Sequence, residues 1–229
     1  MTPQPISTSH HRTTRDSKSD SELAPPSSSP AGSDDLRLST WLRVSWSRSR
    51  QALGDDDRPA AAYVERVATD TVLERAARSV LPDVTADIEN EPVALILTDA
   101  NGIVLSRTGG DSDLFAALDR VDLAPGFRDA ETQVGTNGIG TSLEVGRPLL
   151  VDGDQHFSGP LRSFSCAGAP VTHPVTGAIL GVVDLTTAAQ NSNTLLLSFA
   201  TLAAARLRER MLDDATELDR AIFSAYRSA

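Results

Sequence analysis

Apolar residues recur at helical spacing in two segments near the start of the chain. The first segment begins at Ser33, whose hydroxyl can cap a helix, and stops at Gly54. The second runs over residues 60–81, and Pro82 should end or kink it. We therefore expect a helical N-terminal segment over residues 35–90 that leads into the core of the fold.

From Pro92 onward the pattern changes to short runs of β-branched and aliphatic residues, which are typical of strands. Strands over 93–98 and 103–105 flank an Asn-Gly turn, so they form a predicted β-hairpin. The other expected elements are strands over 148–151, 164–172 and 178–186, and short helices over 113–121 and from Thr136. Because short turns join the strands, we predict an α+β fold with a predominantly antiparallel sheet over residues 91–190.

The final segment, residues 191–229, predicts one long helix. Its apolar positions repeat at steps of three and four, with charged residues between them. The first half should lie on the protein's own sheet, whereas the second half extends past what one sheet face can cover. We therefore predict a homodimer formed partly by this helix. The repeating positions are Leu196, Ala200, Ala203, Leu207, Met211, Leu218, Ile222 and Ala225.

Composition separates the start of the chain from the rest. The first 35 residues hold nine serines and five prolines, a mixture that cannot bury enough apolar surface to offset chain entropy. We expect residues 1–34 to be a disordered tail.

Charge and hydropathy exclude two classes of partner. The formal net charge of −10 and the pI near 4.8 oppose a general attraction to nucleic acid, so we expect no direct DNA binding. The sequence has neither an apolar run of about 18 residues nor the apolar region of a secretory signal. We expect a cytoplasmic protein with no membrane partner.

Residues 131–157 hold the candidate chemistry. Glycines at 135, 138 and 140 allow positive φ angles and close backbone approach. The segment lacks the Walker A lysine and the dinucleotide order of glycines, so nucleotide hydrolysis is not supported. Its backbone amides could hold an anion or a carbonyl group, or the glycines could simply permit a tight turn into a helix. Short hydrogen-bonding side chains lie at Thr136, Asn137, Thr141 and Ser142.

His156 and Cys166 are two further reactive groups near this segment. No short metal-ligand spacing is present, so we expect no metal site. Cys166 leaves three interpretations open: a small buried side chain on an inner strand, which is favoured, a redox-sensing thiol, or a nucleophile paired with histidine. Asp99 and Asp184 are either ligand contacts or, as the favoured interpretation, turn or strand-end residues that accept hydrogen bonds from backbone amides.

Several motifs in order resemble one bacterial family. VSWSRSR, LILTDANGIVL, ETQVGTNGIGTSL, FSCAGAPV and ILGVVDLTT together resemble the N-terminal GAF sensory region of acetoin and dihydroxyacetone catabolism regulators, over about residues 36–212. The resemblance implies a GAF-like antiparallel sheet flanked by helices, with helices packed on one side and a ligand pocket on the other. We expect the ligand to be a small polar metabolite. Within the matching motifs, the expected ligand-binding residues are Thr136, Asn137, Thr141, His156 and Cys166.

The resemblance also bounds the function. Members of the family continue into an ATPase domain and a helix-turn-helix, but this sequence holds no Walker motif, no GAFTGA loop and no basic recognition helix. A single cysteine lacks the three-cysteine pattern of GAF-type methionine sulfoxide reductases, so we expect no enzyme and no cofactor. We expect a sensor that regulates transcription or a partner protein indirectly. Two alternatives remain: a redox sensor or thiol enzyme centred on Cys166, and a ligand-free interaction module.

Overall fold

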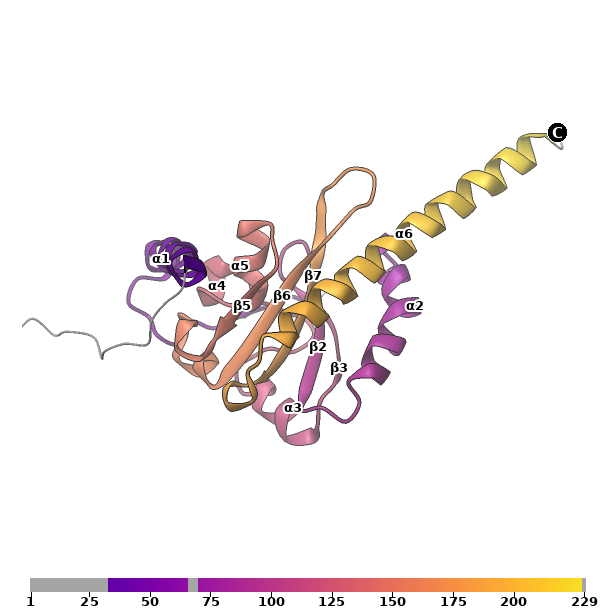
Figure 1. The fold of residues 1–229 in the computed structure, drawn as a ribbon. Helices are drawn as coiled ribbons and strands as arrows, with labels where there is room; N and C mark the ends of the chain where they lie inside the picture. The colour runs from indigo at the N-terminus through magenta and orange to yellow at the C-terminus, as the bar shows by residue number, and fades with distance from the viewer. Residues whose placement is uncertain (1–32, 66–69, 228–229) are drawn as a thin grey trace, which may run out of the picture.

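The structure is a computed structural model that describes residues 33–65 and 70–227. Its centre is a five-stranded sheet in the order β3-β2-β7-β6-β5, and every pairing in it is antiparallel (Figure 1). This arrangement confirms the predicted antiparallel sheet. The strands are β2 (Val93–Asp99), β3 (Val104–Gly109), β5 (Leu149–Asp152), β6 (Phe164–Thr172) and β7 (Ile179–Ala188).

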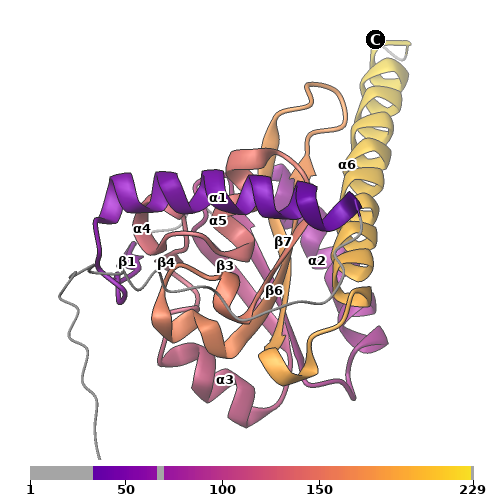
Figure 2. The same ribbon diagram turned by 60° about the vertical axis from the view of Figure 1, so that its left-hand side comes forward.

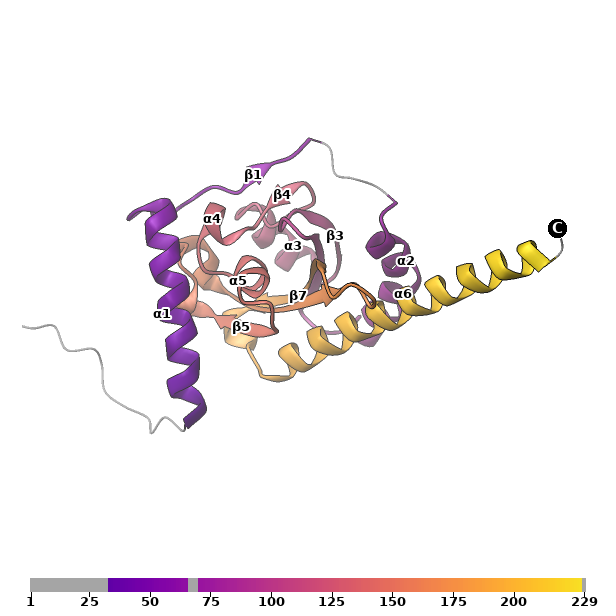
Figure 3. The same ribbon diagram turned by 90° about the horizontal axis from the view of Figure 1, so that it is seen from above.

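Helices cover both faces of this sheet (Figure 3). On one face α2 and α6 pack on the sheet and on each other, and on the other face α3 and α5 contact β2, β6 and β7. The helix α1 lies across α4 (Figure 2) and beside the edge strand β5 (Figure 3). The helices are α1 (Ser33–Leu53), α2 (Val72–Asp87), α3 (Ser112–Asp119), α4 (Glu131–Val134), α5 (Gly138–Val145) and α6 (Leu195–Arg227).

Two hydrophobic cores result from this layering. Along β2, Leu95 and Leu97 point toward α2 and α6, while Ala94 and Ile96 point toward the opposite face. Because alternate residues of a strand face opposite sides, a strand buried on both sides reads as a continuous apolar run. The apolar run at residues 93–97 is therefore explained by burial on both faces.

The predicted second helix is wrong over its first half. Ala62 and Tyr63 form a short strand, β1, that pairs with β4 (Phe127–Arg128). The helix α2 instead begins after Thr71, which forms a capping box with Glu74. The capping box is a specific local signal for the start of a helix. The apolar residues at helical spacing before Thr71 are not preceded by such a signal.

Pro82 does not end α2, contrary to expectation. The helix continues to Asp87, and Pro82 lies on its exposed side. Leu81 and Val84 around it are buried against the core, so packing holds the helix through a residue that lacks a backbone donor. Tertiary contacts outweigh the local helix-breaking tendency here.

The long final helix is confirmed as α6, and its first half lies on the sheet as predicted. Of its repeating positions, the five from Leu196 to Met211 are buried in the core beneath α6. The helix then projects beyond the sheet (Figure 1). The side chains of the other three predicted positions, 218, 222 and 225, lie outside the described residues, as does nearly all of the predicted tail. The homodimer stays a prediction.

Candidate functional site

The glycine-rich segment seats α5 directly on the sheet. A Cβ atom on Gly138 would lie 2.5 Å from Asp184 Oδ1 and 2.6 Å from the Cβ of Cys166, and a Cβ atom on Gly168 would collide with the carbonyl of Gly138. Real side chains essentially never approach so closely. Glycines at 138 and 168 are therefore required by the contact between α5 and β6. This explains a motif that sequence left open between ligand contact and turn formation.

Asn137 occupies the start of α5 and uses its whole amide there. Its Oδ1 accepts hydrogen bonds from the amides of Ile139 (2.9 Å) and Gly140 (2.8 Å). Its Nδ2 donates to the carbonyls of Gly135 (2.8 Å) and Asp129 (3.1 Å). Asn137 is thus the N-cap of α5 and also ties the preceding loop to it.

Thr136 and Thr141 belong to a cluster of four buried hydroxyl residues, which we call the hydroxyl cluster: Ser45, Ser49, Thr136 and Thr141. The hydroxyl of Ser45 lies 2.7 Å from that of Thr136 and 3.3 Å from that of Thr141. The hydroxyl of Ser49 lies 3.1 Å from that of Thr136. Since Ser45 and Ser49 come from α1 and the threonines from the glycine-rich segment, the hydroxyl cluster joins α1 to the core.

A partly buried ion pair reinforces this joint. Arg48 Nε donates to Glu131 Oε1 at 2.6 Å, and Ser45 donates to the other carboxylate oxygen at 2.8 Å. Glu131 is 2% exposed, whereas Arg48 is 37% exposed. The hydrogen bond to Glu131 raises the pKa of Arg48, partly offset by burial. The buried carboxylate needs these donors, so α1 and α4 are held together.

A second polar group, the acidic cluster, lies between α5 and the sheet and comprises Asp129, Asp184, Thr186 and Cys166. Thr186 Oγ1 lies within hydrogen-bonding distance of both Asp184 Oδ2 and the Cys166 sulfur. Asp184 Oδ1 and Asp129 Oδ2 are buried without a hydrogen-bond partner among the residues that the structure describes. Burial raises the pKa of Asp184 to about 7, although the Thr186 hydroxyl lowers it. Burial and the charge of Asp184 likewise raise the pKa of Asp129.

The interpretation of Asp184 as a strand-end residue was wrong. Asp184 lies in the middle of β7, opposite Ile96 on one side and Gly168 on the other, and the donor to its carboxylate is the Thr186 hydroxyl rather than a backbone amide of the described residues. Asp99 does follow its prediction, because it accepts hydrogen bonds from the amides of Asn101 and Ile103 in the hairpin turn. In the sequence, Asp99 and Asp184 each follow a short apolar run, so the two residues looked alike. Only the pairing of the strands shows that Asp99 ends a strand and Asp184 lies within one.

Cys166 is a buried side chain on the inner strand β6, which was the favoured interpretation. Only 4% of it is exposed. Burial, together with the nearby charge of Asp184, raises its pKa well above the usual value for a thiol. A reactive thiol is accessible and has a lowered pKa, so this environment opposes redox or nucleophilic chemistry.

His156 is fully buried beside the 3-10 turn at Gly153–Gln155. Its Nδ1 lies 3.1 Å from the carbonyl of Gly153, which assigns the donor role to Nδ1. Nε2 has no partner among the residues that the structure describes. Burial lowers the pKa of His156 to about 4, so the ring is neutral at physiological pH.

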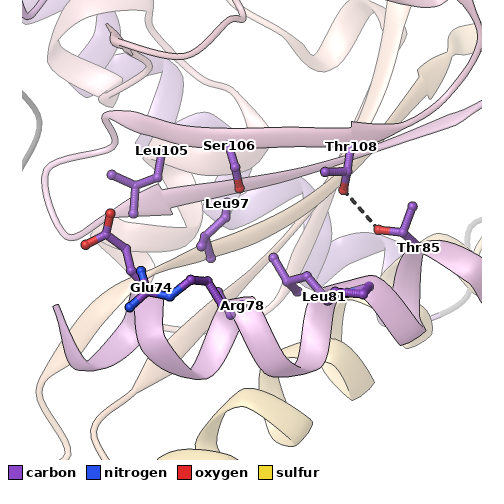
Figure 4. Close-up of a pocket in the computed structure, with 10 residues that line it drawn as sticks. Glu74, Arg78, Leu81, Thr85, Leu97, Leu105, Ser106 and Thr108 are labelled. Atoms are coloured by element: carbon purple, nitrogen blue, oxygen red, sulfur yellow. Dashed lines mark hydrogen bonds between the residues drawn. The ribbon is translucent and has the colours of Figure 1, made fainter. Parts of the chain in front are cut away.

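Two cavities in the described part of the chain lie away from these residues. One of about 580 Å³ lies between α2 and the strands β2 and β3 (Figure 4). Another of about 640 Å³ lies between α1 and the segment after β5, beside Trp46. Neither is lined by any of the five predicted ligand-binding residues. The structure brings Thr136, Asn137 and Thr141 together at α5, places Cys166 on the strand beneath, and sets His156 apart near Trp46 and Phe157.

Sequence reasoning missed the α1 side of the joint. Ser45, Arg48 and Ser49 recur at steps of three and four, which puts them on one helix face. All three lie within the motif VSWSRSR, and their spacing on one polar helix face was the available signal. Asp129 had no signal of its own, because only the fold brings it beside Asp184.

Comparison with known proteins agrees with this fold. In the crystal structure of the E. coli DhaR(N)–DhaL complex, one chain matches with a TM-score of 0.70 at 19% sequence identity, covering 82% of this chain and 66% of that chain. That likeness shows the fold, which is GAF-like as the motifs implied. The class defined by the fold is therefore a GAF-like domain.

Sequence matches identify the family. The family of MimR N-terminal domains matches residues 28–209, and the chain belongs to it. The propane 2-monooxygenase operon transcriptional activator MimR of Mycolicibacterium smegmatis is 41% identical over 182 residues, covering 80% of this chain and 31% of that protein. The acetoin dehydrogenase operon transcriptional activator AcoR of Bacillus subtilis is 26% identical over 203 residues, covering 84% and 33%. The chain thus spans about a third of the length of these relatives.

The geometry predicts that Asn137→Ala destabilises the domain. Removing the side chain deletes the cap of α5 and leaves two buried carbonyls without donors, which should lower the free energy of unfolding by about 2–3 kcal/mol. Urea unfolding measures this, with the exposed Asn90→Ala as the matched control. Unchanged stability together with a lost ligand response would instead assign Asn137 to ligand binding.

Asp184 predicts a pH-dependent gain in stability for Asp184→Asn. A folded-state pKa of about 7, above the usual 3.8, means that the folded protein retains a proton that the unfolded chain releases. The wild type therefore loses stability as pH rises from about 4 to 7, while the neutral variant does not. The variant should gain up to about 4 kcal/mol over the wild type at pH 8, and much less at pH 5, in urea unfolding. An equal difference at both pH values would contradict this.

Proposed function

We propose that the chain is the sensory domain of a transcriptional activator, and that it binds a small molecule and passes the change to an attached or associated output through its terminal helices. The observation that carries this proposal is the family match over residues 28–209. The names of the relatives MimR and AcoR associate them with operons for the oxidation of small organic compounds. By analogy, the ligand would be a small metabolite of the regulated route.

The arrangement of α2 and α6 supports a route for the signal. Both helices pack on the same face of the sheet and on each other, and α6 continues beyond the sheet. A ligand that favours one position of α2 would shift the population of α6 arrangements, provided that it binds the two states unequally. Such a helix can act as the output of the domain. We also infer that the protein works in the cytoplasm, where regulators of transcription act. No helix in the described part of the chain is long and apolar enough to cross a membrane.

The five residues predicted from the resemblance keep a place in this proposal. Thr136 and Thr141 bind α1 to the core through the hydroxyl cluster, and Asn137 fixes α5. These contacts support a role in holding α1 and α5 in place, through which the three residues would pass on the response of the domain. His156 and Cys166, both buried, would contact a ligand only after the core opened.

We further propose that a second copy of the chain covers an exposed apolar row on α6. Leu195, Phe199 and Leu202 are 63%, 41% and 49% exposed and lie on the side of α6 away from its buried residues. In sedimentation at micromolar concentration, the wild type should be a dimer and Leu202→Glu a monomer. The neighbouring exposed Thr201→Glu is the matched control. A monomeric wild type would contradict the proposal.

An interaction module is the second candidate. The observation in its favour is that the structurally similar DhaR(N) was crystallised as a complex with the protein DhaL. A domain of this kind would bind a partner protein and ignore small molecules. The redox alternative has less support, because burial of Cys166 raises the pKa of its thiol.

A ligand screen tests the leading proposal. Diols, hydroxyketones, ketones, alcohols and short carboxylates are added to the purified chain, and the thermal midpoint is measured. A ligand at a hundredfold excess over its dissociation constant adds about 2.7 kcal/mol, which raises the midpoint by roughly 5–10 °C for a domain of this size. If no compound shifts the midpoint, and native mass spectrometry finds no co-purified molecule, the sensory proposal fails and the interaction module gains support.

A further inference from the structure

We propose that the cavity between α2 and the sheet edge binds a neutral, compact molecule with an apolar body and one hydroxyl or carbonyl group. The inference rests on the proposed function, because it assigns a place and a chemical class to the ligand of the sensory domain. Figure 4 shows the cavity, with α2 along one side and β2 and β3 along the other.

The size and lining of the cavity suit a small organic ligand. Its volume is about 580 Å³, within the range of roughly 300–1,000 Å³ that is typical of ligand pockets. Ala77 and Leu81 line it from α2, and Leu97 and Leu105 line it from the strands. These side chains offer an apolar body its main contact surface.

The charged residues at the rim, Glu74 and Arg78, already take part in hydrogen bonds within the protein. The Glu74 carboxylate accepts hydrogen bonds from the backbone and the hydroxyl of Thr71 at 2.9 and 3.0 Å. The Arg78 guanidinium donates to Asp70 at 2.6 Å. Because Arg78 is already paired with Asp70, an anionic ligand would lose water without gaining a free counter-charge. The apolar lining likewise favours a neutral ligand.

A β-bulge in β3 places the polar side chain of Ser106 in the wall of the cavity. The pairing of β2 with β3 shifts between Leu97, which lies opposite Ser106, and Thr98, which lies opposite Val104. One extra residue in β3 therefore brings the consecutive residues Leu105 and Ser106 to the same face, and both line the cavity. An unbulged strand would have turned one of them away.

Ser106 provides the free hydroxyl of this wall. The hydroxyls of Thr85 and Thr108 lie 3.0 Å apart and bond to each other at one end of the cavity (Figure 4). Ser106 has no hydrogen-bond partner among the residues that the structure describes. Its hydroxyl can donate to a carbonyl oxygen or exchange a hydrogen bond with an alcohol. One such group on the ligand is what the wall can satisfy.

The position of the cavity connects binding to output. The buried side of α2, including Ala76 and Val84, packs in the same core as Ala203 and Leu207 of α6. A ligand held between β3 and α2 would fix the distance of α2 from the sheet, and thereby its packing on α6. The cavity is thus placed where a small ligand can bias the projecting helix.

Rigid probes test the assigned chemistry by isothermal titration calorimetry on the full chain. Camphor and borneol carry an apolar body with one carbonyl or hydroxyl group, camphorsulfonate adds a charge to the same skeleton, and myo-inositol is polar throughout. Camphor or borneol should bind at least tenfold more tightly than camphorsulfonate and inositol. Tighter binding of the charged or polar probe would overturn the inference, as would the absence of camphor and borneol binding at millimolar concentration.

Two Ser→Phe variants locate the binding. Ser106→Phe fills the cavity and should weaken camphor binding at least tenfold, whereas Ser79→Phe, at an exposed position on another side of α2, should not change it. Ser106→Ala keeps the cavity open and should weaken binding about fivefold through the lost hydrogen bond, which gives a test if the phenylalanine variant fails to fold. Unchanged affinity in Ser106→Phe and Ser106→Ala, or loss in Ser79→Phe alone, would overturn the inference.

The outcomes separate this inference from the proposed function. If the metabolite screen finds a ligand whose binding Ser106→Phe and Ser106→Ala leave unchanged, the cavity assignment is wrong and the sensory role stands. If neither the screen nor the probes find a ligand, both are wrong.

Discussion

The absence of side chains at Gly138 and Gly168 is the constraint on which this domain depends. It lets the start of α5 lie directly on β6, at a distance that any Cβ atom would prevent. The position of α5 then fixes Asn137 as its cap and turns Thr136 and Thr141 toward Ser45 on α1. The docking of α1 on the core thus follows from two glycines on another part of the chain.

The close contact between α5 and β6 also makes the two faces of the sheet different. Under α5 the space is filled by backbone and by the acidic cluster, where Asp184 lies against Gly138. Under α2 the packing is open, and a cavity of about 580 Å³ remains beside the bulged edge strand. One face is therefore a rigid joint for α1. The other face has the room and the hydroxyl group that a ligand needs, beside the helix that projects from the domain.

Much of the fold could be predicted from sequence. Strand β6 was predicted over residues 164–172, where the structure has it, because turn residues bound an apolar run on both sides. The start of α2 was misplaced, since the capping box at Thr71 specifies a helix start more strongly than apolar spacing does. Pro82 was misread because burial of Leu81 and Val84 depends on contacts far away in sequence.

The candidate site was harder to predict. The motif around Asn137 was found, but whether its amide faces a ligand or caps a helix depends on how closely α5 approaches β6, which no local pattern reports. The cavity beneath α2 depends on a one-residue shift in the pairing of β2 with β3. Such a shift is set by strand pairing across the sheet, so Ser106 gave no sign of its position in the linear sequence.

A crystal structure of the chain grown with camphor tests the central claim most directly, namely that α5 closes one face of the sheet and leaves the ligand site on the other. The expected result is electron density for camphor between α2 and β3, with its oxygen beside Ser106 and with α5 unmoved on β6. Density between α5 and the sheet, beside Asn137 or Cys166, would contradict the claim.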